Sequence, residues 1–400
     1  MQVPTTALLA LCLAFYFDRY AQPYVALLLA LVIVYAVFDL ASWSPRVRNS
    51  ARWVLLTLIV MLLVVTPTLV EIQQRLATSP STHTHDGAIQ TEEAIRFFAA
   101  GKNPYVEDYV QTPMAHWENY FGAPPEELPI LQHLLYLPLN FILPLPLYAI
   151  WQLEFGWFDI RLYHILVFVI LFFALFQLTP EWESKLGVGI FVALQPLFAP
   201  FFIEGRNDVV VLLWLVTAFL CVQRRHITMA ALALGLACAT KTTAWFVAPF
   251  LLAQMWWTGE RRWSVFFLHV CVPFAIVSLV VFVPFLIWDA SAFISDITWF
   301  QTYPFAIDGS GFSRLLLDIG IISDPLTSFP FGILQIIVTV TGIIVLLCWQ
   351  AKRPTLQRMV AAAAVLGLAV GYVARWVTDS YLGFYLSLGF IALFIGPMHE

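Results

Sequence analysis

Charged residues are scarce in this chain, and their scarcity decides the class of protein. Asp, Glu, Lys and Arg make up only 11% of the 400 residues, whereas 61% are hydrophobic, and the mean hydropathy is +0.83. An average soluble domain carries roughly 25% charged and about 45–50% apolar residues. Because a soluble fold could not bury this much apolar surface, the composition predicts an all-α polytopic membrane protein.

Cysteine pairs, basic runs and nucleotide-binding motifs are also missing. The five cysteines show no CxxC or Cys/His metal spacing, so neither a disulfide framework nor a structural metal centre is indicated. The net charge is −5 and there is no basic run, which argues against nucleic acid as a partner. The sequence contains no P-loop, no Rossmann glycine fingerprint and no serine nucleophile elbow. We therefore expect an activated substrate to arrive through the membrane rather than as a cytoplasmic nucleotide.

Long apolar runs, by contrast, recur along the whole chain, and a run of this kind can cross a hydrocarbon core about 30 Å thick. We expect about 12 transmembrane helices, near residues 3–17, 22–41, 52–70, 160–178, 185–203, 208–222, 227–240, 243–257, 264–288, 328–350, 358–374 and 381–397. No basic stretch precedes the first run, so we interpret it as a span and not as a cleaved signal. A further apolar segment, 129–150, is ambiguous because four prolines interrupt it.

Short basic connectors decide how the chain is threaded, because the cytoplasmic connections of membrane proteins are enriched in Lys and Arg. These connectors lie at residues 46–52, 224–225, 261–262 and 352–358. All four fall on the cytoplasmic side only if 129–150 does not cross the membrane. The prolines agree with this, since each one removes a backbone donor and breaks a straight helix.

Two large exoplasmic loops follow from this threading. The first runs over 71–159, and its proline-broken part is expected to lie along the membrane as juxtamembrane helices. The second covers 289–327. The chain then divides into N-terminal accessory helices at 1–50, a catalytic module at 51–327 and C-terminal helices at 328–400. Function is expected on the exoplasmic face, where the polar residues gather.

The stretch HTHDGAIQTEEAIRFFAAGKNPY, residues 83–105, is a polar segment inside the first loop. After Asp86 it has helical spacing, with Ile95, Phe98 and Ala99 on the inward side, and a Gly-Lys-Asn-Pro turn ends the helix. Asp86 has two interpretations that can both hold. It caps the N-terminus of the helix, or it accepts a proton from a sugar hydroxyl close to the membrane. We predict that Asp86 is the catalytic base.

His83 and His85 stand beside this acid and allow two kinds of site. Together with Asp86 they could ligate a divalent cation, since two histidines next to a carboxylate suit such ions. They could equally hydrogen-bond a phosphate, and Glu92 is a further candidate for contact with the substrate. The same pattern is common in polar loops that hold no metal. The expectation is therefore that no cofactor is needed, with a divalent metal at these three residues as the alternative.

More polar residues lie between or within apolar runs on the same face. Arg206, Asn207 and Asp208 separate two spans, where an Arg–Asp pair can stabilise a tight turn or bind anionic oxygen and orient a catalytic group. Lys241 interrupts an apolar run, and a cation at membrane depth is costly enough to be a functional candidate, although lysine can also snorkel to the interface. We favour phosphate binding for Lys241. Three arginines near span ends could clamp a phosphate with their guanidinium forks: Arg161, Arg314 and Arg375.

Several of these motifs resemble the GT-C superfamily of polyprenyl-phosphate-sugar-dependent glycosyltransferases, over roughly residues 50–330. HDGAIQTEEAIRFFAAGKNPY resembles the first exoplasmic loop of mannosyltransferases in that superfamily, where an Asp leads an amphipathic helix that ends in a Gly-x-x-Pro-Tyr turn. FGWFDIRLYHI, IEGRNDVVVLLW and ATKTTAWFVAPFLL resemble the segments that place Arg161, Asn207 with Asp208, and Lys241. The chain departs from the superfamily in lacking a paired Asp-Glu at Asp86 and in carrying a polar, proline-rich insert at 106–128.

The resemblance implies a GT-C-like bundle and an inverting transfer of a hexose, with mannose as the first expectation. The donor would be a polyprenyl-phosphate sugar, and the acceptor a hydroxyl on a lipid or a glycan. Asp86 would take the acceptor's proton, while Lys241 and one or more arginines would hold the leaving lipid phosphate. The expected partners are that donor, that acceptor and membrane lipids. The expected location is the plasma membrane of a prokaryote rather than the endoplasmic reticulum.

Two other classes of protein share this layout. A transporter or flippase for lipid-linked sugars would show repeated halves and helices broken at mid-membrane, and the sequence shows no convincing repeat. A non-catalytic subunit of a membrane assembly would need no catalytic acid. An assay with polyprenyl-phosphate-mannose distinguishes both from an enzyme.

Overall fold

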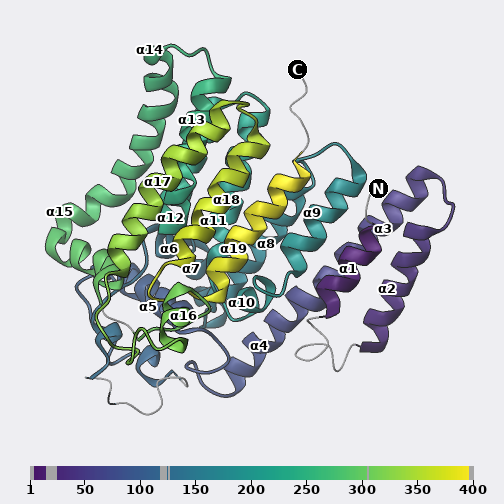
Figure 1. The fold of residues 1–400 in the computed structure, drawn as a ribbon. Helices are drawn as coiled ribbons and strands as arrows, with labels where there is room; N and C mark the ends of the chain where they lie inside the picture. The colour runs from purple at the N-terminus through teal and green to yellow at the C-terminus, as the bar shows by residue number, and fades with distance from the viewer. Residues whose placement is uncertain (1–3, 15–24, 118–123, 125–126, 304–305, 396–400) are drawn as a thin grey trace.

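The computed structural model describes residues 4–14, 25–117, 124, 127–303 and 306–395, and in these ranges the chain forms a helical bundle with no β-strand (Figure 1). The predicted all-α fold class is therefore confirmed. Several predicted segments fall in part outside the described residues: the spans 3–17, 22–41 and 381–397, the loops 71–159 and 289–327, and the insert 106–128.

Among the described residues, three helical stretches are long and apolar enough to cross a membrane. The first joins α3 (Pro45–Val60) through a π-helical turn to α4 (Thr66–Ala77), the second joins α14 (Trp263–Phe266) through another π-helical turn to α15 (Val272–Thr302), and the third is α17 (Phe331–Ala351). Seven shorter apolar helices accompany them: α1 (Thr5–Ala14), α2 (Val25–Leu40), α8 (Ile160–Leu175), α11 (Asp208–Gln223), α12 (Ile227–Thr240), α18 (Leu356–Tyr372) and α19 (Asp379–Phe394). The apolar helices indicate a membrane protein, and the figure of about 12 crossings stays a prediction.

One predicted span is wrong in its continuity. The run 185–203 divides into α9 (Trp182–Leu194) and α10 (Ala199–Ile203), because a proline interrupts the helix. Gln195 at the break is buried, and its Nε2 donates to the carbonyl oxygen of Gly383 on α19, 2.8 Å away. The break leaves α10 at the end of the bundle that also carries α5 (Asp86–Ala99) (Figure 1).

The proline-rich segment 129–150 forms no single straight helix, as its prolines predicted. It divides into a 3-10 turn at Pro129–Gln132, a short α6 (Leu139–Ile142) and α7 (Leu145–Phe155). α7 has no buried residue, and Leu153 is 86% exposed. An apolar helix with this much open surface suits a membrane interface, and its juxtamembrane placement stays a prediction.

α15 breaks where the predicted span 264–288 ends. Asp289 has non-helical backbone angles (φ −160°, ψ 98°), and its carboxylate accepts a hydrogen bond from the amide of Ala292 at 2.9 Å. The side chain therefore caps a new helical segment. Part of the predicted loop 289–327 is thus helical, and so is α16 (Phe312–Asp318) within it.

The core surrounds α11, which is mostly buried and packs against both α8 and α12. α11 starts at Asp208, and the antiparallel α12 returns to Thr240, so this pair brings Asp208 and Lys241 to one end of the bundle. α5 and α10 lie at the same end, called here the α5 end (Figure 1). The connections between α13 (Ala248–Thr258) and α14, and between α17 and α18, lie at the opposite α14 end.

A buried ion cluster attaches the first two helices to the bundle. Arg52 on α3 is fully buried, and its guanidinium donates to Glu183 of α9 at 2.7 and 2.9 Å and to Asp39 of α2 at 2.6 Å. Asp39 also accepts a hydrogen bond from the amide of Thr6 on α1, at 2.8 Å. Four helices therefore meet at one guanidinium group.

We expect Arg52→Met to destabilise the fold by about 3–5 kcal/mol, because it leaves Asp39 and Glu183 without their buried cation. Arg48→Gln is the matched control. Its guanidinium lies 3.4 Å from Glu183 with the side chain 37% exposed, so its removal should cost less than about 1 kcal/mol. Thermal unfolding of the detergent-solubilised protein measures both losses. Equal losses would contradict a structural role for the cluster.

Candidate active site

α5 opens at the predicted catalytic loop, but its cap differs from the prediction. His85 is the N-cap residue, with extended backbone, and its Nδ1 lies 3.0 Å from the amide nitrogen of Gly87. Asp86 is the first residue of the helix. Both side chains therefore lie close to the free amide of Gly87 at the start of the helix. At the other end Gly101 follows the helix with φ +76°, as predicted, while Ala99 is exposed rather than inward.

Asp86 is held as an anion beside the helix N-terminus. Its Oδ1 lies 2.7 Å from His85 Nδ1 and accepts a hydrogen bond from the Gly87 amide at 2.6 Å. Burial acts to raise the pKa of Asp86, but His85, the Gly87 amide and the charge of Arg206 outweigh it and leave this pKa below its usual value. The side chain is still 15% exposed. An ionised, partly open carboxylate can accept a proton.

Arg161 holds the loop that precedes Asp86 in the chain. It is fully buried, its Nη1 donates to the carbonyl oxygen of His83 at 2.7 Å, and its Nε and Nη2 donate to Asp159 at 2.8 and 2.7 Å. His83 itself has φ +56°, a strained conformation for a residue with a side chain. The structure thus gives Arg161 a loop-holding role that the sequence did not predict, and its contact with a substrate phosphate stays untested.

Glu92 lies about one and a half turns beyond Asp86 on α5 and connects α5 to α4 and α8. Its carboxylate accepts hydrogen bonds from Arg75 of α4 at 2.9 and 2.8 Å and from the amide of Ile160 at the start of α8 at 2.8 Å. Arg75 also donates to Asp159 at 2.8 Å. Burial raises the pKa of Glu92 and the charge of Arg75 opposes it. These bonds make Glu92 a fixed support of α5, and its predicted contact with substrate stays untested.

The α10–α11 turn brings the second group of predicted residues next to this loop. The amide of His85 donates to the carbonyl oxygen of Glu204 at 2.8 Å. Gly205 follows with φ +100°, and a Cβ there would lie 3.0 Å from the Cβ of Ala88. Only glycine therefore allows this turn to approach α5 so closely.

Lys241 and Asp208 form an ion pair at the α5 end. Lys241 Nζ lies 2.8 Å from Asp208 Oδ1 and 3.0 Å from Asn207 Oδ1, and 5.0 Å above the ring of Tyr381. The Lys241 side chain is 14% exposed and that of Asp208 5%. The other carboxylate oxygen of Asp208 is buried and has no hydrogen-bond partner within the described part of the chain. Asn207 is fixed in turn by Asn140 of α6, whose Oδ1 accepts from it at 2.8 Å.

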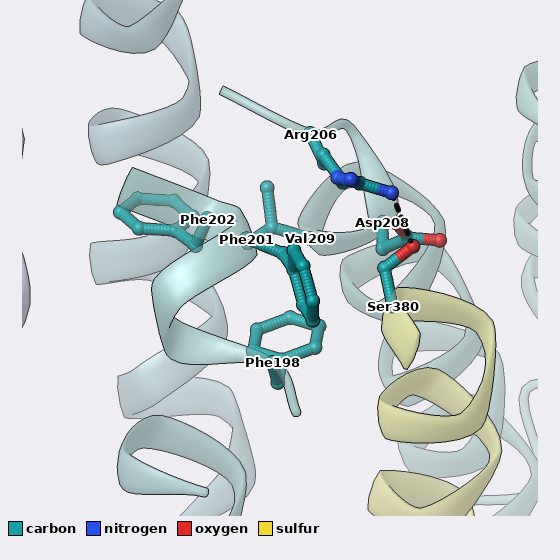
Figure 2. A pocket seen from close by; sticks show the side chains of 7 residues that line it. All are labelled: Phe198, Phe201, Phe202, Arg206, Asp208, Val209 and Ser380. Atoms are coloured by element: carbon teal, nitrogen blue, oxygen red, sulfur yellow. Dashed lines mark hydrogen bonds between the residues drawn. The ribbon is translucent and has the colours of Figure 1, made fainter. Parts of the chain in front are cut away.

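Arg206 extends from the same turn over a small hollow, with Asp208 and Ser380 beside it and the rings of Phe198 and Phe201 on the other side (Figure 2). Arg206 Nη1 donates to Ser380 Oγ at 3.1 Å, and its guanidinium lies 4.5 Å above the ring of Phe201. The hollow has a volume of about 10 Å³, which is room for one water molecule. Arg206 therefore presents a cation between Asp86 and α19.

Tyr136 lies between the loop at Asp86 and the turn that carries Arg206 and Asp208. It was not among the residues predicted from the sequence. A Cβ built on Gly87 would lie 1.8 Å from the Tyr136 hydroxyl oxygen, so this hydroxyl rests directly on the first turn of α5. Burial and then the charge of Asp86 raise the pKa of Tyr136, and Arg206 and Asp208 also act on it. Its hydroxyl thus stands among the charges of both groups. The only signal in the sequence was an aromatic residue in a proline-broken apolar run.

We expect Gly87→Ala to lower any activity of this site by at least about tenfold while the protein stays folded. The new methyl group would overlap the Tyr136 hydroxyl and lie 2.8 Å from its ring carbon Cζ, which forces Tyr136 away from Asp86. Gly332→Ala is the control, because a Cβ there meets nothing within 4 Å. Unchanged activity in Gly87→Ala would show that the position of Tyr136 does not matter.

The remaining predicted residues have other partners. Arg314 pairs with Asp318 at 2.9 Å on the exposed face of α16. Arg375 donates to the carbonyl oxygens of Thr327 and Pro325, each at 2.8 Å, and so ties the loop before α17 to the end of α18. His83 Nδ1 lies 3.1 Å from Glu71. In the described ranges, no three His, Cys, Asp or Glu side chains gather in a way that could hold a metal ion.

Comparison with known proteins gives one match. The family profile of Glycosyltransferase family 87 matches residues 131–375, which is more than half of the chain. The matched region includes Tyr136, Asp208 and Lys241, whereas Asp86 precedes it. No curated protein and no solved structure matches the chain.

Proposed function

This chain belongs to glycosyltransferase family 87, and on that premise we propose that it moves a hexose, mannose before other sugars, from a polyprenyl-phosphate donor to a hydroxyl acceptor on a lipid or glycan. The observation that supports this most directly is the meeting of Asp86, Arg206 and the Lys241–Asp208 pair around Tyr136. A carboxylate base and two cations close together are what a transfer from a lipid phosphate requires.

In the proposed reaction, Asp86 accepts the proton of the acceptor hydroxyl while that oxygen attacks the anomeric carbon of the sugar. The bond between the anomeric carbon and the phosphate oxygen breaks, and polyprenyl phosphate leaves with the bonding electrons. Lys241 and Arg206 stabilise the negative charge that grows on the leaving phosphate. Attack from the face opposite the leaving group inverts the anomeric configuration. Arg161 and Glu92 keep the loop and α5 in place during these steps.

The proposed site faces the exoplasm. Asp208 opens α11, and Arg224 follows its last residue, so these two residues lie roughly 24 Å apart at 1.5 Å per residue. The basic connectors after α11, α13 and α17 therefore lie away from Asp86 and Lys241, which supports a cytoplasmic α14 end. A multi-pass protein in a prokaryotic plasma membrane fits this arrangement.

The test is a transfer assay with the purified full chain and polyprenyl-phosphate-mannose, with lipid extract supplying acceptors. The expected result is a mannosylated product formed together with free polyprenyl phosphate. Polyprenyl-phosphate-glucose tests the choice of sugar. Movement of the intact donor between leaflets of a vesicle without product would identify a flippase. If the assay shows neither product nor movement of the donor, the proposal is refuted and an assembly subunit remains as the alternative.

A further inference from the structure

A large cavity lies at the α14 end, away from Asp86 and Lys241. Its volume is about 510 Å³, and it is an open cavity lined by the start of α12, the end of α13, α14 and the π-helical turn that follows. Met255 and Val270, each 1% exposed, form its base, and the rings of Trp256 and Phe266 line it at a centroid distance of 5.4 Å. The inner part of the cavity is therefore apolar and aromatic.

The rim of this cavity is cationic. Arg225, Arg261 and Arg262 line it together with one acid, Glu260, which lies 3.8 Å from Arg262. The ion pairs of the described residues include neither Arg225 nor Arg261. Thr228 Oγ1 and His269 Nδ1, 3.1 Å apart, add neutral polar groups. Two guanidinium groups are thus left without a counterion beside an apolar pocket.

Arg225 stands where glycine is the usual residue. α11 ends in a Schellman motif, in which the amide of His226 donates to the carbonyl of Cys221 at 2.8 Å and that of Arg225 to Val222 at 3.1 Å. This motif requires left-handed backbone, and Arg225 has φ +61°. Arg261, across the cavity, has φ +54°. Both positions therefore carry a long cationic side chain on a backbone conformation that favours glycine.

Exposed apolar residues lie next to the lining residues of the cavity in the chain. Met229 follows the lining residue Thr228 and is 59% exposed. Leu268 precedes the lining residue His269 and is 60% exposed. The ring of Trp263 packs against that of Trp256 at a centroid distance of 4.5 Å, and Trp263 is 75% exposed. A ligand that fits both parts has an anionic group for the rim and hydrocarbon for the outer surface.

We propose that this cavity binds an anionic phospholipid of the adjacent leaflet. Arg225 and Arg261 donate hydrogen bonds to its phosphate oxygens, and its acyl chains lie along Met229 and Leu268. The charge of the rim selects against zwitterionic lipids, and the hydrocarbon contact selects against free phosphate. The site is separate from the one proposed for glycosyl transfer and does not depend on it.

The test is native mass spectrometry of the full chain in detergent, titrated with dioleoylphosphatidylglycerol and, separately, with dioleoylphosphatidylcholine. We expect the first phosphatidylglycerol to bind at least tenfold more tightly than phosphatidylcholine. Arg225→Gln with Arg261→Gln should weaken it at least tenfold. The matched control, Arg224→Gln with Arg353→Gln, removes the same charge outside the cavity lining and should change the affinity less than twofold.

Three results would overturn the proposal. Equal weakening in the control pair would mean general electrostatic attraction, and equal binding of phosphatidylcholine would mean no recognition of charge. Full displacement by millimolar inorganic phosphate would assign the site to a soluble anion. Arg225→Gly separates binding from folding, because it should keep or raise the unfolding temperature and still weaken phosphatidylglycerol binding. A lowered unfolding temperature with unchanged binding would make Arg225 a structural residue only.

Discussion

Asp86→Asn should slow glycosyl transfer by about 10²–10⁴-fold, the usual range for loss of a general base. Asparagine keeps the shape of the side chain, and its Oδ1 can still accept the hydrogen bond from the Gly87 amide, but it cannot take up the acceptor's proton. The expected change is in kcat, with the donor KM and the unfolding temperature close to those of the unmodified chain. Asp108→Asn is the control, since Asp108 is an exposed acid that only accepts a hydrogen bond from the Val110 amide, at 3.1 Å.

The pH dependence follows from the same geometry. Because the pKa of Asp86 is lowered, the base is ionised at neutral pH, and its contribution to the rate should fall only as the pH drops through that lowered pKa. The ionised carboxylate of Asp86 also stabilises the fold. This stabilisation is present above the usual pKa of aspartate and is lost on acidification. Transfer at an undiminished rate by Asp86→Asn would remove Asp86 from the mechanism and leave the fold assignment intact.

Lys241→Met should have the second large effect, and it acts in two separable ways. On its own it leaves the carboxylate of Asp208 buried without a cation, which should destabilise the fold by about 3–5 kcal/mol. Combined with Asp208→Asn, it removes both charges, so much of the stability should return. Transfer should nevertheless stay about 10²–10³-fold slower in the double variant, because a preorganised charge at the leaving phosphate is missing.

The measurement is kcat and donor KM beside the unfolding temperature for the single and double variants. Lys185→Met is the matched control, a lysine that lies 5.1 Å over the ring of Trp182. Recovery of both stability and transfer in the double variant would show that Lys241 serves only to neutralise Asp208. Recovery of stability alone is the result that the proposed function requires.

The sequence allowed the helical class and many of the polar site residues to be predicted. Both predictions depend on the high free-energy cost of placing polar groups in an apolar surrounding. Charge inside apolar runs is expensive, so Lys241 and Asp208 could be identified before their contact was known, and the 2.8 Å bond between them explains how that cost is reduced. The break of 129–150 followed from proline chemistry alone. These signals depend on residues close together in the chain.

What could not be predicted depends on residues far apart in the chain. Arg161 satisfies its guanidinium with Asp159 and with the His83 carbonyl 78 positions away, so its burial was invisible in the local pattern. Tyr136 reaches Gly87 only because α6 and its approach fold back over α5. The helix cap was misassigned because histidine is a rare capping residue and Asp86, beside it, is a common one.

In the proposed reaction, where Lys241 binds the donor phosphate, the bond between Lys241 and Asp208 would affect turnover. A phosphate that approaches Lys241 meets an ammonium group already occupied by an internal anion, so the donor must share or displace that partner. When the spent lipid carrier departs, Asp208 is already in place to take the ammonium back, so the empty site needs no outside counterion before the next cycle.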